Sequence, residues 1–133
     1  KGVKVGDNVV ADGALLGRVS WVQAGESWVE LVWDGKSLVD VRNSADLENP
    51  GRALLQGKYI SGSKINGEIK YYSGDFVANP GDVLISTGLD KRFLPNIPIA
   101  QIVGKINSNE HQIYELKSLA DIDYLKSVII ISM

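Results

Sequence analysis

The sequence predicts an all-β protein, and three features lead to this prediction. The apolar residues are mostly Val, Ile and Leu, which favour strands, and they occur in short runs. The 14 glycines supply many tight turns. Turn signals separate the apolar runs at a spacing typical of small barrels and sandwiches. The length fits one domain, or two small subdomains that share a core.

The stretch of residues 80–104 organises the predicted fold. It begins with a turn at Gly81, continues as a short apolar strand, and stops at Gly88. A loop bracketed by Pro95 and Pro98 follows, and these prolines exclude the loop from the interior of a sheet. A second apolar strand then completes the unit.

The start of the chain repeats this design. Residues 6–13 and 81–88 both open with Gly-Asp and close with Gly at the same offset. Each is followed by a Gly-basic-aliphatic triplet, at residues 17–19 and 104–106, with a longer loop in the second copy. The pattern fits two related β-units, although Gly-Asp turns before apolar strands are also common in unrelated β proteins.

Several turns and one helical turn can be placed from local signals. Asp12-Gly13, Asp34-Gly35 and Asn66-Gly67 between apolar runs each predict a hairpin. Residues 118–126 predict a single helical turn, with Ser118 or Asp121 as its cap. The glycines expected to be structural turn residues are Gly13, Gly17, Gly81, Gly88 and Gly104.

The composition argues against most catalytic and cofactor chemistry. The chain has no cysteine, so disulfides and thiolate chemistry are excluded, and its net charge of −2 gives no reason to expect nucleic acid. The single histidine, His111, lies in a polar turn, and we expect His111→Ala to change stability by less than ~0.5 kcal/mol. Ser86 is the nearest imitation of a nucleophile, but flanking glycines are missing. We therefore predict no catalytic, cofactor-binding or metal-binding residues.

Three tryptophans, Trp21, Trp28 and Trp33, lie close together in the sequence. One interpretation is a stacking surface for a small ligand or a glycan. The other is that the indoles fill the core and the ends of a barrel, because aromatic rings bury a large area each. We favour the second interpretation.

Four motifs give the chain a family resemblance. Residues 13–19, 81–89 and 92–99, with the tail at 118–131, resemble the extracytoplasmic domain of MreC, a family of bacterial rod-shape-determining proteins. The resemblance covers nearly the whole chain and keeps the order of the motifs. In the middle, about residues 33–72, it is limited to Gly-rich turns.

The resemblance implies a more detailed fold. It implies two small, packed β-barrels of the six-stranded type, with chymotrypsin-like topology but without catalytic residues, and one short helical turn near the C-terminus. The expected first barrel spans about residues 16–75. The expected second barrel combines residues 1–15 with residues 76–133.

The resemblance also implies a function and a location. The domain is expected to be a non-enzymatic scaffold of the bacterial cell-elongation complex, organising lateral peptidoglycan synthesis and rod shape without a cofactor. The implied partners are a class B penicillin-binding protein, MreD, MreB across the membrane, and further copies as a dimer or filament. The implied location is extracytoplasmic, with a transmembrane helix and a coiled coil preceding this segment, which itself has no apolar run of spanning length. The alternative is a β-barrel module that binds a small ligand or glycan through the three tryptophans.

The loop with the two prolines is the candidate partner-binding site. The prolines order the loop in advance, which lowers the entropy cost of binding. Phe93 and Leu94, flanked by Arg92 and Ile97, are candidate anchors because aromatic residues and Arg are common at interfaces. The favoured alternative is that Phe93 plugs the end of its own barrel.

Overall fold

The computed structural model describes residues 2–45, 51–73, 76–106 and 112–133. Within these ranges the chain forms ten strands and one short 3-10 helix, η1 (Ile122–Tyr124). The strands, in chain order, are β1 (Asn8–Ala11), β2 (Ala14–Gln23), β3 (Glu26–Leu31), β4 (Asp34–Asn43), β5 (Arg52–Ser61), β6 (Lys64–Tyr72), β7 (Val83–Ser86), β8 (Pro98–Ile106), β9 (Gln112–Ser118) and β10 (Ile129–Ile131).

Six consecutive strands close into a barrel. Their order around the barrel is β4-β5-β6-β9-β8-β7, and every neighbouring pair is antiparallel. Closure depends on the pairing of β4 with β7, in which Val41 lies opposite Ser86. A closed barrel leaves no unpaired strand edge, so the backbone groups of this part are satisfied internally.

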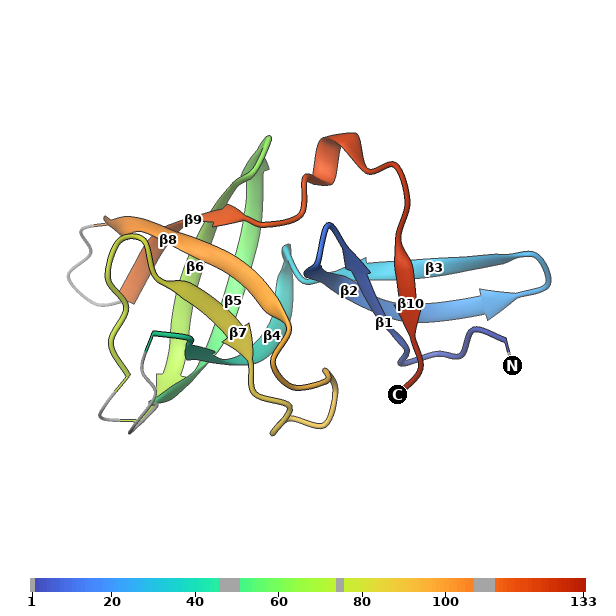
Figure 1. The fold of residues 1–133 in the computed structure, drawn as a ribbon, viewed down its shortest axis with the longest axis horizontal. Coiled ribbons are helices and arrows are strands. Elements are labelled where there is room, and N and C mark those ends of the chain that lie inside the picture. The colour runs from blue at the N-terminus through green and yellow to red at the C-terminus, as the bar shows by residue number, and fades with distance from the viewer. Residues whose placement is uncertain (1, 46–50, 74–75, 107–111) are drawn as a thin grey trace.

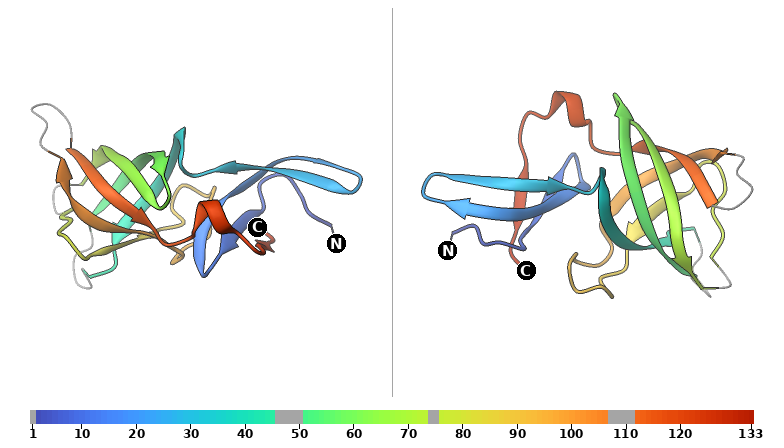
Figure 2. Two further views of the ribbon diagram at one scale, coloured as in Figure 1. Left: turned by 90° about the horizontal axis from the view of Figure 1, so that it is seen from above. Right: turned by 180° about the vertical axis from the view of Figure 1, so that it is seen from behind.

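The remaining strands form an open sheet beside the barrel. The order is β10-β1-β2-β3, again antiparallel, and both chain termini lie in this part (Figure 1). The β2–β3 hairpin extends past β1 and β10, as the two further views in Figure 2 show. Segment β3–β4 leads from the sheet into the barrel, and η1 leads back from the barrel to β10 (Figure 1).

Two hydrophobic clusters hold the structure together. The larger one fills the barrel and includes Val10 of β1 and Leu15 of β2, so the open sheet contributes side chains to the barrel core. The smaller cluster covers the other side of the sheet and includes Val9 and Val19. Ile122 of η1 packs against both clusters, so this side chain connects the core of the barrel with the core of the open sheet.

The fold confirms the all-β class and the short helical turn but not the second barrel. β3 and β10 are the edges of an open sheet, so the expected pair of barrels with chymotrypsin-like topology is not found. The strands also divide differently from the expected boundaries. The barrel contains β4 to β9, residues 34–118, and the sheet contains residues 8–31 together with β10.

The two Gly-Asp units have matching turns, one in each part. Gly6 N–H donates to Val19 O and Val19 N–H to Asp7 O, both at 2.8 Å. Gly81 N–H donates to Ile102 O and Ile102 N–H to Asp82 O, again both at 2.8 Å. In both turns the aspartate accepts from the N–H three residues earlier, at 2.8 Å from Lys4 and at 3.0 Å from Asn79.

These hydrogen bonds support the predicted repeat but correct its alignment. They make Val19 equivalent to Ile102, so the proposed match of residues 17–19 with residues 104–106 is wrong. The register of β8 shifts between Ile102 and Gly104, where the strand is irregular. A three-residue similarity was too short to identify this register.

One of the three hairpin signals is confirmed and two are wrong. Asp12 and Gly13 both have positive φ angles, of 54° and 77°, and connect β1 to β2 as expected for a two-residue turn. Asp34-Gly35 opens β4, which lies in a different sheet from β3. Asn66-Gly67 lies inside β6, because the turn between β5 and β6 falls earlier, at Gly62.

Candidate interaction site

The loop between β7 and β8, residues 87–97, is held in place by polar side chains. Ser86 Oγ donates to Leu94 O at 2.6 Å and accepts from Ile97 N–H at 2.9 Å. Asp90 Oδ1 accepts from the N–H groups of Arg92 and Phe93 at 3.1 and 3.2 Å. Because Ser86 is fully buried and both roles of its hydroxyl are used, it positions the loop and is not placed as a nucleophile.

Asn8 of β1 connects this loop to the open sheet. Its Nδ2 donates to Arg92 O at 3.1 Å, and its Oδ1 accepts from Leu94 N–H at 2.7 Å. Asn8 is completely buried, so both bonds form away from water. Removing the amide would leave buried backbone groups unsatisfied, which makes Asn8 a structural link between the two parts.

A buried carboxylate anchors the start of the same loop. Asp40 of β4 forms an ion pair with Arg52 of β5, and its Oδ1 accepts from Thr87 Oγ1 at 2.9 Å. The side-chain hydrogen bonds to Asp40, followed by its charge, raise the pKa of Arg52. Asp90 Oδ2 accepts from Asp40 N–H at 3.1 Å. The loop is therefore hydrogen-bonded to both the side chain and the backbone of Asp40.

Asn8 and Asp40, which hold this loop, were not among the residues predicted from the sequence. Asp40 stands between Val39 and Val41, and Asn8 directly precedes Val9-Val10. A polar residue at a buried strand position must find a partner, and this signal was available in the sequence. The sequence did not indicate which loop would supply the hydrogen-bonding partner.

The four predicted anchor residues do not form one exposed surface. Phe93 is 2% exposed and belongs to the barrel core, so the alternative that it plugs its own barrel holds. Leu94 and Ile97 are half-buried, and only Arg92 is exposed. The proposed aromatic anchor at Phe93 is therefore wrong, because the ring fills the barrel instead of facing solvent.

The predicted turn glycines separate into two groups. Gly13, Gly81 and Gly88 have positive φ angles and lie in turns or loops, as expected. Gly17 and Gly104 lie inside β2 and β8 and are not turn residues. At Gly17 a Cβ would overlap the carbonyl oxygen of Glu30, so this glycine permits close approach of β2 and β3, whereas at Gly104 the space is open.

The three tryptophans have different environments. Trp33 is 3% exposed, and its Nε1–H donates to Ser118 Oγ at 3.3 Å. Trp21 and Trp28 face each other across β2 and β3 with ring centroids 6.0 Å apart and planes at 87°, and they are 46% and 61% exposed. Core filling is correct for Trp33 and wrong for the other two, which form a solvent-facing pair.

The cavities and titratable groups of the described residues do not form a tryptophan-lined pocket or a metal site. Four cavities lined by described residues, with volumes of about 230 to 480 Å³, have no tryptophan in their walls. Within the described ranges, no group of three or more His, Cys, Asp or Glu residues is arranged to hold a metal ion. His111 lies outside the described residues, so its predicted exposure stays a prediction. No helix in the described part of the chain has the length and apolar character needed to cross a bilayer.

The open sheet presents two unpaired edges. At one edge, β10 pairs only with β1 and carries Ile129, which is 64% exposed, next to the exposed Val128 and Ile130. At the other edge, β3 carries Trp28. Edge strands with exposed apolar side chains are sites where another chain can add.

Comparison with known proteins gives one family match and several structural matches. The family described as "Rod shape-determining protein MreC, barrel core" matches residues 1–132. No curated protein matches the sequence in a direct comparison. The chain is similar to the crystal structure of MreC from Pseudomonas aeruginosa, with 22% identity and a TM-score of 0.80, over 98% of this chain and 82% of that one.

Two further solved structures of MreC are also similar to this chain. One is the major periplasmic domain of the "cell shape-determining filament MreC", with 20% identity and a TM-score of 0.77, over 100% of this chain and 82% of that one. The other is MreC from Helicobacter pylori in a complex with a penicillin-binding protein, PBP2, with 14% identity and a TM-score of 0.65, over 92% of this chain and 74% of that one.

The fold and the site define an all-β module whose buried polar groups serve structure and whose sheet edges stay open. The chain belongs to the MreC family of rod shape-determining proteins, since the family match extends over almost its whole length. The resemblance found in the sequence is thereby confirmed. So is the predicted class of function, a shape-determining scaffold.

Proposed function

We propose that this domain is a non-enzymatic scaffold of the bacterial cell-elongation complex, where it organises lateral peptidoglycan synthesis. The observation that carries the proposal is the family match over residues 1–132. The use of the buried Ser86 hydroxyl in two structural hydrogen bonds supports the non-enzymatic role. The periplasmic description of a structural relative supports an extracytoplasmic location, and we propose an N-terminal transmembrane anchor for the full protein.

The proposed principal partner is a class B penicillin-binding protein. The complex of the Helicobacter pylori relative with PBP2 supports this choice. Since Phe93 lies inside the barrel, we place the contact on the open sheet, where the β10 edge carries exposed apolar side chains. Contacts with MreD and MreB through the anchored protein, and self-association as a dimer or filament, belong to the same proposal.

The test is direct capture of the partner. The immobilised domain is incubated with a purified class B penicillin-binding protein that has been labelled with fluorescent penicillin, and the retained label is measured. We expect saturable retention that free domain competes away. Absence of retention at micromolar concentrations of both proteins would contradict the proposal.

A pair of variants tests the location of the contact. Ile129→Lys places a charge on the β10 edge, and the matched variant Leu89→Lys places the same charge on an exposed aliphatic residue of the barrel loop. We expect only Ile129→Lys to weaken capture, while both variants unfold at the temperature of the unchanged domain. Equal capture by the two variants would move the contact away from β10. Sedimentation of the free domain over a range of concentrations tests self-association separately.

A further inference from the structure

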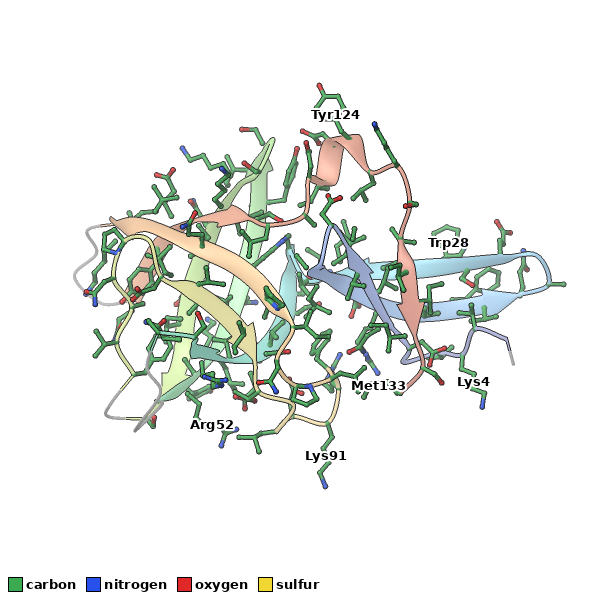
Figure 3. All side chains as sticks on the ribbon, viewed as in Figure 1. Lys4, Trp28, Arg52, Lys91, Tyr124 and Met133 are labelled. Atoms are coloured by element: carbon green, nitrogen blue, oxygen red, sulfur yellow. The ribbon has the colours of Figure 1, made fainter. Side chains whose placement is uncertain are left out.

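The β2–β3 hairpin is a projection with an exposed aromatic face. β1 pairs with β2 only up to Arg18, so beyond that point β2 continues with β3 as its only ladder partner, and the projection is visible in Figures 1 and 2. The Trp21–Trp28 pair lies on this projection, and Figure 3 shows Trp28 on the opposite side of the hairpin from Lys4. An isolated two-stranded ribbon is marginally stable in water, and tryptophan is enriched at protein interfaces.

The two faces of the hairpin differ in what they contact. Val19, Val22 and Val29 point to one face and belong to, or pack against, the hydrophobic cluster of the sheet. The other face carries the cross-strand pairs Trp21 with Trp28, Gln23 with Glu26 and, at the base of the hairpin, Arg18 with Glu30. The valine face therefore holds the hairpin to the domain, and the Trp21–Trp28 pair faces solvent.

The tip of the hairpin carries negative charge. The β2–β3 hairpin contains two glutamates and one cation, Arg18, which gives a net formal charge of −1, and Glu26 lies at the tip beside the turn. Glu26 accepts a hydrogen bond from Gln23, and Glu30 accepts one from Ser37 Oγ at 3.4 Å. The ion pairs found among the described residues, Arg52–Asp40 and Lys70–Glu68, include neither glutamate.

The cations of this face are grouped around Glu30, at the base of the hairpin. Lys36 and Arg92 line a cavity of about 230 Å³ with Glu30, on the barrel side of the hairpin. The guanidinium of Arg18 is directed at the turn before β1, where a Cβ on Gly6 would come within 3.3 Å of Nη2. Uncompensated negative charge is thus found beside the indoles at the Glu26 end.

We propose that the Trp21–Trp28 face binds lysine or arginine side chains of a segment of a protein partner. The negative faces of the indole rings attract a cation, and the carboxylate of Glu26 supplies charge complementarity beside them. The same charge disfavours an anionic membrane surface, and a neutral sugar would make no use of it. This inference rests on the proposed function in one respect, namely that the partner is a protein.

A titration followed by NMR tests the chemistry of the surface. The probes are the peptides acetyl-GRGRGRG-amide and acetyl-GEGEGEG-amide, and the signals are the three indole N–H resonances. We expect the arginine peptide to shift the Trp21 and Trp28 resonances and leave that of the buried Trp33 unchanged. The glutamate peptide should shift none of them.

Variants measure the contribution of each group. We expect Trp28→Ala to weaken binding of the arginine peptide by at least about twofold, which corresponds to the lower range for an exposed cation–π contact, and Glu26→Gln to weaken it in the same direction. Tyr71→Ala, which removes an equally exposed aromatic residue from β6, should leave affinity unchanged. All three positions are exposed, so unfolding temperatures should remain at the value of the unchanged domain.

Several outcomes would overturn the inference. These are equal binding of both peptides, unchanged affinity in Trp28→Ala, or shifts of the Trp21 and Trp28 resonances by chitohexaose or phosphatidylcholine vesicles but not by the arginine peptide. Capture of the penicillin-binding protein separates this inference from the proposed function. Equal capture by the unchanged domain and by the Trp21→Ala, Trp28→Ala double variant removes the inference alone, whereas no capture by either removes the proposed function.

Discussion

Gly88 lies two residues after the end of β7, in a backbone conformation that few other residues adopt. Its φ is +78°, and a Cβ at this position would lie 3.0 Å from Cβ and Cδ of Pro95. We expect Gly88→Val to destabilise the fold by about 1–3 kcal/mol, because the β-branched side chain adds contact strain to the unfavourable φ. Urea unfolding of the purified domain measures the difference.

Gly104→Ala is the matched control for this prediction. Gly104 lies in β8 without a positive φ, and nothing lies within 4 Å of an added Cβ. Its unfolding midpoint should equal or exceed that of the unchanged domain. A Gly88→Val variant as stable as Gly104→Ala would show that the Pro95 loop adapts without cost.

Phe93 is buried in the barrel core, so its truncation should be costly. Phe93→Ala should destabilise the domain by about 3–5 kcal/mol, because it opens a cavity in the barrel core. Arg92→Ala, at the exposed neighbouring position, should change stability by less than ~0.5 kcal/mol. Thermal and urea unfolding compare the two variants, and similar stabilities would place Phe93 outside the core.

At the scale of elements, the turn that opens β4 depends on pH. Burial raises the pKa of Asp34, but hydrogen bonds from the N–H groups of Lys36 and Ser37, both at 2.7 Å, outweigh it, so the pKa is lowered from its ordinary value of 3.8. A lowered folded-state pKa means that the carboxylate stabilises the turn above the unfolded-state pKa. This contribution is lost as the pH falls through the folded-state value.

Asp34→Asn tests this contribution. Asp34 is largely exposed, so the effect is small, and it should appear as a shallower loss of stability in acid for the variant than for the unchanged domain. Urea unfolding at pH 7 and at pH 3, together with an NMR titration of the Asp34 carboxyl, measures it. A carboxyl that titrates above 3.8 would reverse the predicted sign.

The strand and turn signals of the sequence were accurate where the decisive contacts are local. Asp12-Gly13 formed its hairpin because both residues can take positive φ angles between two apolar strands. Asn66-Gly67 did not, because Leu116 and Leu55 fill the barrel interior against Gly67, which needs a residue without a side chain in the middle of β6. The sequence alone does not distinguish a glycine that is required for close packing from a glycine that is required for a turn.

At the scale of the whole molecule, the barrel and the open sheet should unfold together. Leu15 belongs to β2 but is fully buried in the barrel core. We expect Leu15→Ala to cost about 2–5 kcal/mol and to speed hydrogen exchange equally for protected amides of the barrel and of the sheet. Faster exchange in the sheet alone would indicate two independent units. Val103→Ala, on the exposed surface of β8, is the control and should change neither.

The sequence by itself determined the β class, the repeated Gly-Asp turns, the capped helical turn at Asp121, and membership of the family. Each of these features depends on residue types at short, fixed spacings, and such spacings can be recognised in the sequence. The candidate site was harder to predict. Phe93 was correctly assigned only as the favoured alternative, and the exposure of the Trp21–Trp28 pair agrees only with the less favoured interpretation of the tryptophans.

Only the tertiary structure decided which strands close and which stay open. Asn8 reaches Arg92 and Leu94 across 84 and 86 positions of sequence, and β7 closes the barrel against β4. Alternation along a strand indicates which side chains share a face, but not whether that face meets a core or water. Burial is set by partners distant in sequence, and for that reason two tryptophans with the same local pattern as core residues lie on the surface.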